Sequence, residues 1–178
     1  MDKRIAGRWM RGVAVAAAAG ALLTPHNAKA APIDELNRFA GTWHSQGTFV
    51  DSPYQKAGRA TATTTCAWSI DHNFMICQQS VTMNGTPDSD LGIYSYDPVG
   101  NVYHFYNVHA SRTTSSTILV DGKTITYPFS FNDKGTSVTI RTLNVWQSPD
   151  LYTWRTEYST DGGTTWKPMA SGKSERSP

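Results

Sequence analysis

The sequence predicts an all-β fold, an antiparallel up-and-down barrel of about nine to ten strands that follows a short N-terminal helix. Strand-like runs succeed one another from Gly41 onward, and the connections between them are too short for crossover helices. Polar and apolar residues alternate within these runs, for example from Val138 to Arg141. Because ten antiparallel strands rarely remain one open sheet, we expect the sheet to close on itself.

The first 30 residues have the features of a signal peptide. Four basic residues precede an apolar run from Val13 to Leu23, and Ala28-Lys29-Ala30 has the small-x-small pattern that a signal peptidase cleaves. We therefore expect an exported protein, periplasmic or extracellular, whose residues 31–178 form a single β-barrel domain. The apolar run is shorter than the roughly 20 residues of a spanning helix, and no later run comes close, so we expect no integral membrane segment.

Removal of residues 1–30 would change the charge of the protein. The full chain has 16 Lys and Arg against 14 Asp and Glu, whereas residues 31–178 have 11 basic and 13 acidic residues. The remaining basic residues are scattered singly and form no stripe that could neutralise phosphates. We expect no nucleic-acid partner. The oligomeric state stays open, since nothing in the sequence indicates it.

The elements can be placed in chain order. Pro32 to Ala40 is the one helical candidate, because apolar residues recur at every third position and two acidic residues stand in its first turn. Turn sequences such as Asn84-Gly85 and Asp121-Gly122 separate the strands that follow, and Pro128 indicates a bulge or an edge. The predicted strands are Trp43 to Val50, Arg59 to Ser69, Phe74 to Met83, Leu91 to Tyr96, Val102 to His109, Thr113 to Val120, Lys123 to Phe131, Thr136 to Leu143, Leu151 to Tyr158 and, more weakly, Thr165 to Gly172.

The two cysteines of the chain are placed to form a disulfide. If the strands on either side of Asp71-His72 pair through a two-residue turn, Trp68 lies opposite Met75 and Cys66 lies opposite Cys77. An exported protein meets an oxidising compartment, where such a bond forms and persists. No C-x-x-C pair is present to support redox exchange, so we expect a structural disulfide.

Several short segments resemble a known family. A short helix that runs into Gly41-Thr42-Trp43 resembles the opening of lipocalins and other calycins, in which the tryptophan closes one end of the barrel. The chain also resembles a family of small bacterial calycin-like proteins of unassigned function, through Cys66-Ala67-Trp68-Ser69, Tyr94-Ser95-Tyr96-Asp97, Val102-Tyr103, the Asp121-Gly122 turn and the C-terminal Asp-Gly-Gly-x-Thr-Trp segment. The resemblance implies a fold and no particular activity.

The segment from Ser159 to Trp166 resembles the Asp-box turn of sialidase propellers. Its glycines suit a tight turn with positive φ, and Asp161 can accept hydrogen bonds from backbone N–H groups. A propeller would repeat the segment at a fixed period, but the chain holds a single copy. We therefore expect the turn to stabilise a hairpin.

Catalytic and metal-binding motifs are missing from the sequence. His44, His72, His104 and His109 have no metal-binding spacing, and we found neither G-x-S-x-G nor a cysteine free to pair with a histidine. Some calycin-like barrels bind haem through a histidine late in the chain, whereas no histidine follows His109. We expect no metal and no cofactor, and the catalytic residues, if any exist, stay unknown.

The aromatic residues are the main functional signal. Tryptophan, tyrosine and phenylalanine exceed what one barrel floor needs, and a barrel of nine or ten strands has room for a ligand. Arg141, Arg155 and Glu157 would form either a polar group inside the barrel or an outer charged face, and the outer face is favoured. As candidates to line an interior binding site we name Trp43, Trp68, His104, Arg141 and Trp154.

The leading functional hypothesis is a barrel that binds a small apolar or amphipathic ligand in its interior. One alternative is a cofactor-free barrel enzyme of the isomerase or cyclase type, with His104 or Glu157 as its acid–base residue. Another is a periplasmic protease inhibitor that presents residues 31–38 to a protease cleft. We expect binding rather than catalysis.

Overall fold

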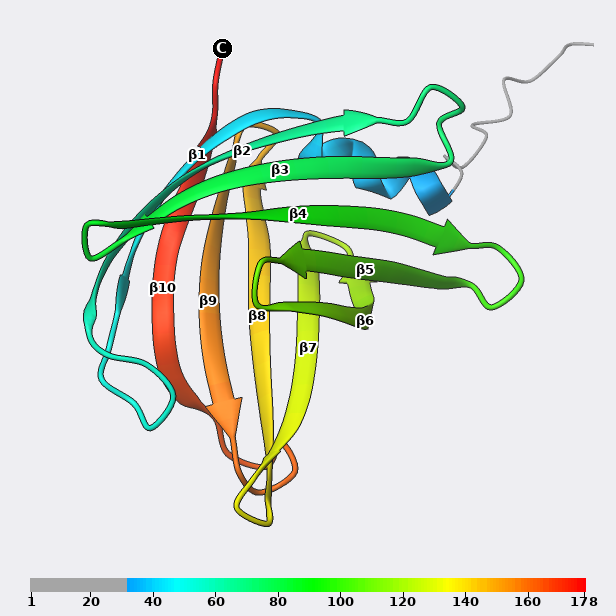
Figure 1. Ribbon diagram of the computed structural model, residues 1–178. Helices are drawn as coiled ribbons and strands as arrows, with labels where there is room; N and C mark the ends of the chain where they lie inside the picture. Colours follow the sequence, from blue (N-terminus) through cyan, green and yellow to red (C-terminus); the bar gives the residue numbers. More distant parts are fainter. Residues whose placement is uncertain (1–31) are drawn as a thin grey trace, which may run out of the picture.

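The structure is a computed structural model, and it describes residues 32–178. The predicted signal peptide lies outside the described residues. The barrel is closed and antiparallel, and its ten strands follow the chain order, with β1 between β2 and β10 (Figure 1). Their bounds are β1 Gly41–Phe49, β2 Gly58–Trp68, β3 Phe74–Met83, β4 Thr86–Asp97, β5 Val102–His109, β6 Arg112–Asp121, β7 Thr124–Asp133, β8 Thr136–Ser148, β9 Leu151–Ser159 and β10 Lys167–Arg176. The predicted fold class is confirmed.

The N-terminal helix closes one end of the barrel. It is a 3-10 helix, η1, that spans Pro32–Phe39 and lies at the end of the barrel where β4 finishes (Figure 1). Leu36 and Phe39 are buried there among residues from strands around the barrel: Cys66, Met75, Cys77, Tyr94, Ile118, Ile125 and Trp146. This apolar cluster fills the end of the barrel that η1 covers. No helix within residues 32–178 is long and apolar enough to cross a membrane.

The register of the β2–β3 hairpin agrees with the sequence prediction. Trp68 pairs with Met75 and Cys66 pairs with Cys77, and the two sulfurs form a disulfide with 4.0 Å between the Cα atoms. The turn is longer than the predicted two residues, because β2 ends at Trp68 and β3 begins at Phe74. His72 takes a positive φ of 59°, and the backbone N–H of Ser69 donates to the carbonyl of Phe74.

Three strands have an end that lies four or five residues from its predicted position, whereas the other differences are of one or two residues. β4 begins at Thr86 rather than Leu91, because Asn84 and Gly85 both take positive φ and form a two-residue turn that starts the new strand at once. β8 continues to Ser148, five residues beyond the predicted end at Leu143. β10 spans Lys167–Arg176, since Thr165 belongs to the preceding turn and hydrogen-bonds to Asp161.

Among the neighbouring strands of the barrel, β6 and β7 share the shortest hydrogen-bonded ladder. These strands pair only where Leu119, Val120 and Asp121 face Thr126, Ile125 and Thr124. Beyond this point they diverge, whereas β7 continues its regular pairing with β8 through Pro128 (Figure 1). Pro128, which lacks a backbone N–H, thus lies two residues past the end of the β6–β7 ladder.

Candidate functional site

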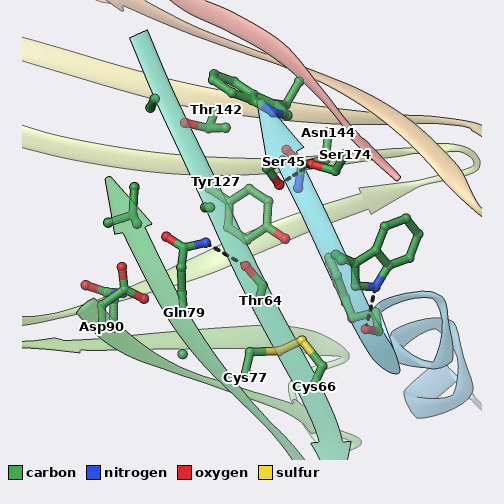
Figure 2. A pocket seen from close by; sticks show the side chains of 18 of the residues that line it. Ser45, Thr64, Cys66, Cys77, Gln79, Asp90, Tyr127, Thr142, Asn144 and Ser174 are labelled. Carbon is green, nitrogen blue, oxygen red and sulfur yellow. Dashed lines mark hydrogen bonds between the residues drawn. A yellow bond between two sulfur atoms is a disulfide. The ribbon is translucent and has the colours of Figure 1, made fainter. Parts of the chain in front are cut away.

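The interior of the barrel contains a cavity of about 470 Å³. Its floor is the apolar core above η1, where Phe39, Trp43 and the Cys66–Cys77 disulfide contribute to the lining. Along β3, every second side chain from Cys77 to Met83 lines this space, as the pleat requires, and Figure 2 shows Cys77 and Gln79 on that face. The volume falls within the range of small-molecule sites, about 300–1,000 Å³.

Trp154 forms an aromatic wall of the cavity. Its indole lies over the backbone of two glycines on neighbouring strands, Gly47 of β1 and Gly172 of β10, which are paired with each other. A Cβ atom at either glycine would come within 2.4 Å of the indole. The two glycines therefore let the ring lie flat against the wall, and its partly exposed surface faces the cavity.

Trp43 lies at the floor and is 1% exposed. Its indole N–H donates to the carbonyl oxygen of Phe39 over 2.9 Å, and its ring packs against Tyr152, with ring centroids 5.0 Å apart. These contacts join the end of η1 to β1 and β9. Trp43 thus closes the bottom of the cavity and presents no free polar atom to a ligand.

Polar side chains form a band at mid-height. The hydroxyls of Ser45 and Ser174 are 2.6 Å apart, and the Gln79 amide donates to the Thr64 hydroxyl over 2.8 Å (Figure 2). Asn144 also lines the cavity and is 9% exposed. Among the described residues, its side-chain amide has no hydrogen-bond partner. Its polar atoms remain accessible from the cavity, because the one side-chain polar atom within residues 32–178 that is fully buried without a partner is the indole nitrogen of Trp146. A ligand or water in the cavity can therefore bond to the Asn144 amide.

Two tyrosines add hydroxyl groups deeper in the cavity. The hydroxyls of Tyr94 and Tyr127 are 3.3 Å apart. Burial raises the pKa of both phenols above the ordinary value, so both remain protonated at neutral pH. Burial likewise raises the pKa of Tyr152. The cavity therefore offers neutral hydroxyl groups rather than phenolate anions.

An acidic wall lies on β4 near the open end of the barrel. Asp88 and Asp90 both line the cavity. A ring nitrogen of His109 lies 2.9 Å and 3.0 Å from the two Asp88 carboxylate oxygens, and this hydrogen bond lowers the pKa of Asp88. Burial instead raises the pKa of Asp90, an effect that Asn107 beside it reduces. The two carboxylates thus differ, since one is paired with a histidine and the other lacks an ion-pair partner within residues 32–178.

A second recess of about 690 Å³ joins the interior to the β6–β7 gap. It shares Phe105, Asn107, Tyr127 and Thr142 with the central cavity. Its outer lining includes Pro128 and Ser115, on the two strands that diverge, and Tyr54 of the β1–β2 connection packs edge-on against Phe131 and Tyr158 at its rim. The interior is therefore reached from the side of the barrel as well as from its open end.

The five side chains that the sequence analysis named have different positions. Trp43 and Trp154 line the cavity, whereas Trp68, His104 and Arg141 do not. Trp68 lies beside η1, where its indole donates to the Asn37 side chain over 2.7 Å and stacks on His72. His104 alternates with Phe105, which points inward, so the pleat turns His104 outward.

Arg141 belongs to a charged group on the outer face of the barrel. Its neighbour Thr142 points inward, and Arg141 forms an ion pair with Glu157 at 2.8 Å. Arg155 binds the other carboxylate oxygen of Glu157 at 3.1 Å, and the Arg141 guanidinium lies 3.7 Å from the centre of the Trp166 ring. These contacts fasten the β9–β10 turn to the wall.

The turn from Ser159 to Trp166 is organised around one carboxylate. Asp161 accepts hydrogen bonds from the Ser159 hydroxyl over 2.7 Å and from the backbone N–H of Thr165 over 2.9 Å, and the Thr165 hydroxyl donates to it as well. Gly162 and Gly163 take φ of 69° and 90°. Both glycines thus provide the backbone conformation that the tight turn needs.

Several lining residues were missed by sequence reasoning, among them Gln79, Asp90, Phe105, Tyr127 and Asn144. A signal for some of them was present in the cysteines. The disulfide points inward, and residues paired across neighbouring strands lie on the same face of the sheet. Cys77 pairs with Gly92, and Gly92 pairs with Asn107, so all three line the cavity. Residues two positions away on β3 to β5 then face inward too, which identifies Gln79, Asp90 and Phe105.

No protein-family model matches the chain, and no curated protein matches it either. Solved structures do resemble it. One is Rv2717c from M. tuberculosis, with a TM-score of 0.57, 16% identity, and coverage of 83% of this chain and 99% of that one. Another is the S-type phycobiliprotein lyase CPES from Guillardia theta, with a TM-score of 0.55, 11% identity, and coverage of 82% and 92%. Both are calycin-like barrels of ten strands, so the comparison supports the calycin-like fold that the sequence resemblance implied.

Proposed function

We propose that this protein binds a small amphipathic molecule that contains a ring, in the interior of its barrel. The observation that carries the proposal is the cavity of about 470 Å³, with the half-buried Trp154 indole on one wall and the unpartnered Asn144 amide beside it. Apolar walls with a few convergent polar groups are the common composition of ligand sites. The likeness to the two solved barrels concerns the fold, so the proposal depends on the cavity itself.

The alternatives from the sequence have less support. His104 and Glu157, the candidate acid–base residues of a barrel enzyme, lie outside the cavity lining. In the proposed inhibitor segment, Leu36 is fully buried and Pro32–Phe39 is helical. These positions favour neither the barrel enzyme nor the protease inhibitor over interior binding.

The test is a calorimetric titration of the purified protein with 1-naphthalenemethanol, a neutral probe with one polar group. We expect a single saturable site. Substitution of Trp154 by Ala should weaken binding about tenfold, because a buried aromatic contact is worth about 0.5–1.5 kcal/mol beyond its area. The matched control is Trp166→Phe, which changes a tryptophan on the outer turn and should leave the affinity unchanged. Equal affinity of the Trp154→Ala variant and the unsubstituted protein would contradict the proposal.

A further inference from the structure

The charges of the cavity lining are all of one sign. Two carboxylates, Asp88 and Asp90, belong to the lining, and no Lys, Arg or His is among the residues that form it. The nearest histidine, His109, is occupied by Asp88 through the hydrogen bonds described above. In a space shielded from water, a charge of the same sign is disfavoured more strongly than at the surface. Arg112 lines the adjoining recess, where its guanidinium lies over the Phe129 ring, and is not part of the central cavity. The central cavity itself therefore disfavours anions.

Asp90 is the carboxylate that lacks a counter-ion. Its cross-strand neighbours are Gln79 on β3 and His109 on β5, and Asn107 beside it favours its charged form. Within residues 32–178 no basic side chain forms an ion pair with Asp90, since His109 pairs with Asp88. Burial penalises the charged form of Asp90, and the nearby charge of His109 offsets part of that penalty. A cation that arrives with a ligand would offset the desolvation cost of this half-buried carboxylate.

Asp90 faces the aromatic wall across the barrel. In the ring of ten strands, β4 and β9 are five strands apart in either direction, so Asp90 of β4 and Trp154 of β9 lie on opposite walls. β8, next to β9, contributes Asn144, whose side chain is about nine-tenths buried and unpartnered among the described residues (Figure 2). A molecule in the cavity therefore meets a ring on one wall and a carboxylate on the other.

We infer that the ligand is a cationic amphiphile, an amine whose apolar ring packs on Trp154 while its ammonium group pairs with Asp90. This inference rests on the proposed function and specifies the chemical class of the ligand. The ammonium group has three N–H donors, and the Asp90 carboxylate accepts from it. Remaining polar groups of the ligand can bond to the Asn144 amide and the neighbouring hydroxyls. A carboxylate of the same shape would place a third carboxyl group beside Asp88 and Asp90.

Three probes with one naphthalene ring test the inference: 1-naphthylmethylamine, 1-naphthalenemethanol and 1-naphthoate, which are cationic, neutral and anionic at pH 7. Calorimetric titration should give a Kd for the amine at least tenfold below that of the alcohol and at least a hundredfold below that of naphthoate. The Asp90→Asn variant should bind the amine and the alcohol within about threefold of each other. The control Asp121→Asn, at the exposed end of β6, should keep the full preference.

The outcomes separate the inference from the proposed function. If the alcohol binds in a manner that depends on Trp154 but the amine has no advantage over naphthoate, the inference is wrong and interior binding stands. Retention of the amine preference by Asp90→Asn also overturns the inference. If none of the three probes binds, both the inference and the proposed function are contradicted. Comparison of the probes on the unsubstituted protein decides the matter even if a variant fails to fold.

Discussion

The indole of Trp154 occupies the space where a side chain at position 172 would lie, since a Cβ built on Gly172 would be 2.4 Å from Cζ2 of that ring. The same Cβ would be 2.2 Å from the backbone carbonyl oxygen of Gln46, which cannot move aside without breaking the β1–β10 pairing. The glycine is therefore required by the geometry of the wall. Without it, the aromatic surface of the cavity could not lie flat.

The first prediction concerns this contact. The Gly172→Ala variant should lose about 1–3 kcal/mol of unfolding free energy, the usual cost of an overpacked site. Urea denaturation would measure it. The control is Ser171→Ala on the exposed face of the same strand, where the change should be within about 0.5 kcal/mol. A Gly172→Ala variant as stable as the control would show that Trp154 and the Gln46 carbonyl leave room for a Cβ atom at position 172.

The second prediction concerns the Cys66–Cys77 disulfide, which closes a loop between strands paired in register. Reduction should lower the unfolding free energy by about 2–3 kcal/mol, because the reduced unfolded chain regains conformational freedom. Urea denaturation with and without dithiothreitol would measure the difference. The Cys66→Ala, Cys77→Ala double variant should be insensitive to the reductant. A sensitive double variant would assign the effect to something other than this bond.

The third prediction concerns pH and the β9–β10 turn. Hydrogen bonds from Thr165 and Ser159 hold the pKa of Asp161 well below its ordinary value. A depressed carboxyl pKa contributes stability above the unfolded pKa, near 3.9, and this stability is lost as pH falls toward the folded pKa. Asp161→Asn should therefore lower the melting temperature at pH 7 and reduce the decline between pH 5 and pH 2. The control is Asp121→Asn, and identical melting curves for the two variants across this range would refute the role of Asp161.

The fourth prediction concerns Asp90 and has the opposite sign. Burial raises the pKa of this carboxyl, so the folded state is destabilised as pH rises through the unfolded pKa toward the folded pKa, and the full penalty applies above it. At pH 7 the Asp90→Asn variant should melt at a higher temperature than the unsubstituted protein, even though it loses its preference for amines. Differential scanning calorimetry would measure this. A lower melting temperature would mean that Asp90 is retained for stability rather than for a ligand.

Much of the fold could be predicted from the sequence because its signals are local. The two-residue turn at Asn84-Gly85 and the register that joins Cys66 to Cys77 depend on residues close together in the chain. Strand ends were harder to predict. The first residues of β4 include Asp88, Ser89 and Asp90, whose polarity hides a strand with one face on a polar cavity.

The site was predicted only in part, because the direction of each strand face is a long-range property. β5 has rings on both faces, so local alternation could not decide between His104 and Phe105. Arg141 lies between the apolar Ile140 and the polar Thr142, so its own segment does not say which face it belongs to. Thr142 lines the cavity, which places Arg141 and its ion-pair partner Glu157 outside. The barrel closure that sets Asp90 opposite Trp154 has no signature in any single segment.

A crystal structure of the protein with 1-naphthylmethylamine would test the central claim most directly. We predict that the naphthalene ring lies inside the barrel against the indole of Trp154, with the ammonium nitrogen within hydrogen-bond distance of the Asp90 carboxylate. A naphthalene ring found only on the outer surface of the barrel, with the interior unchanged, would contradict the account.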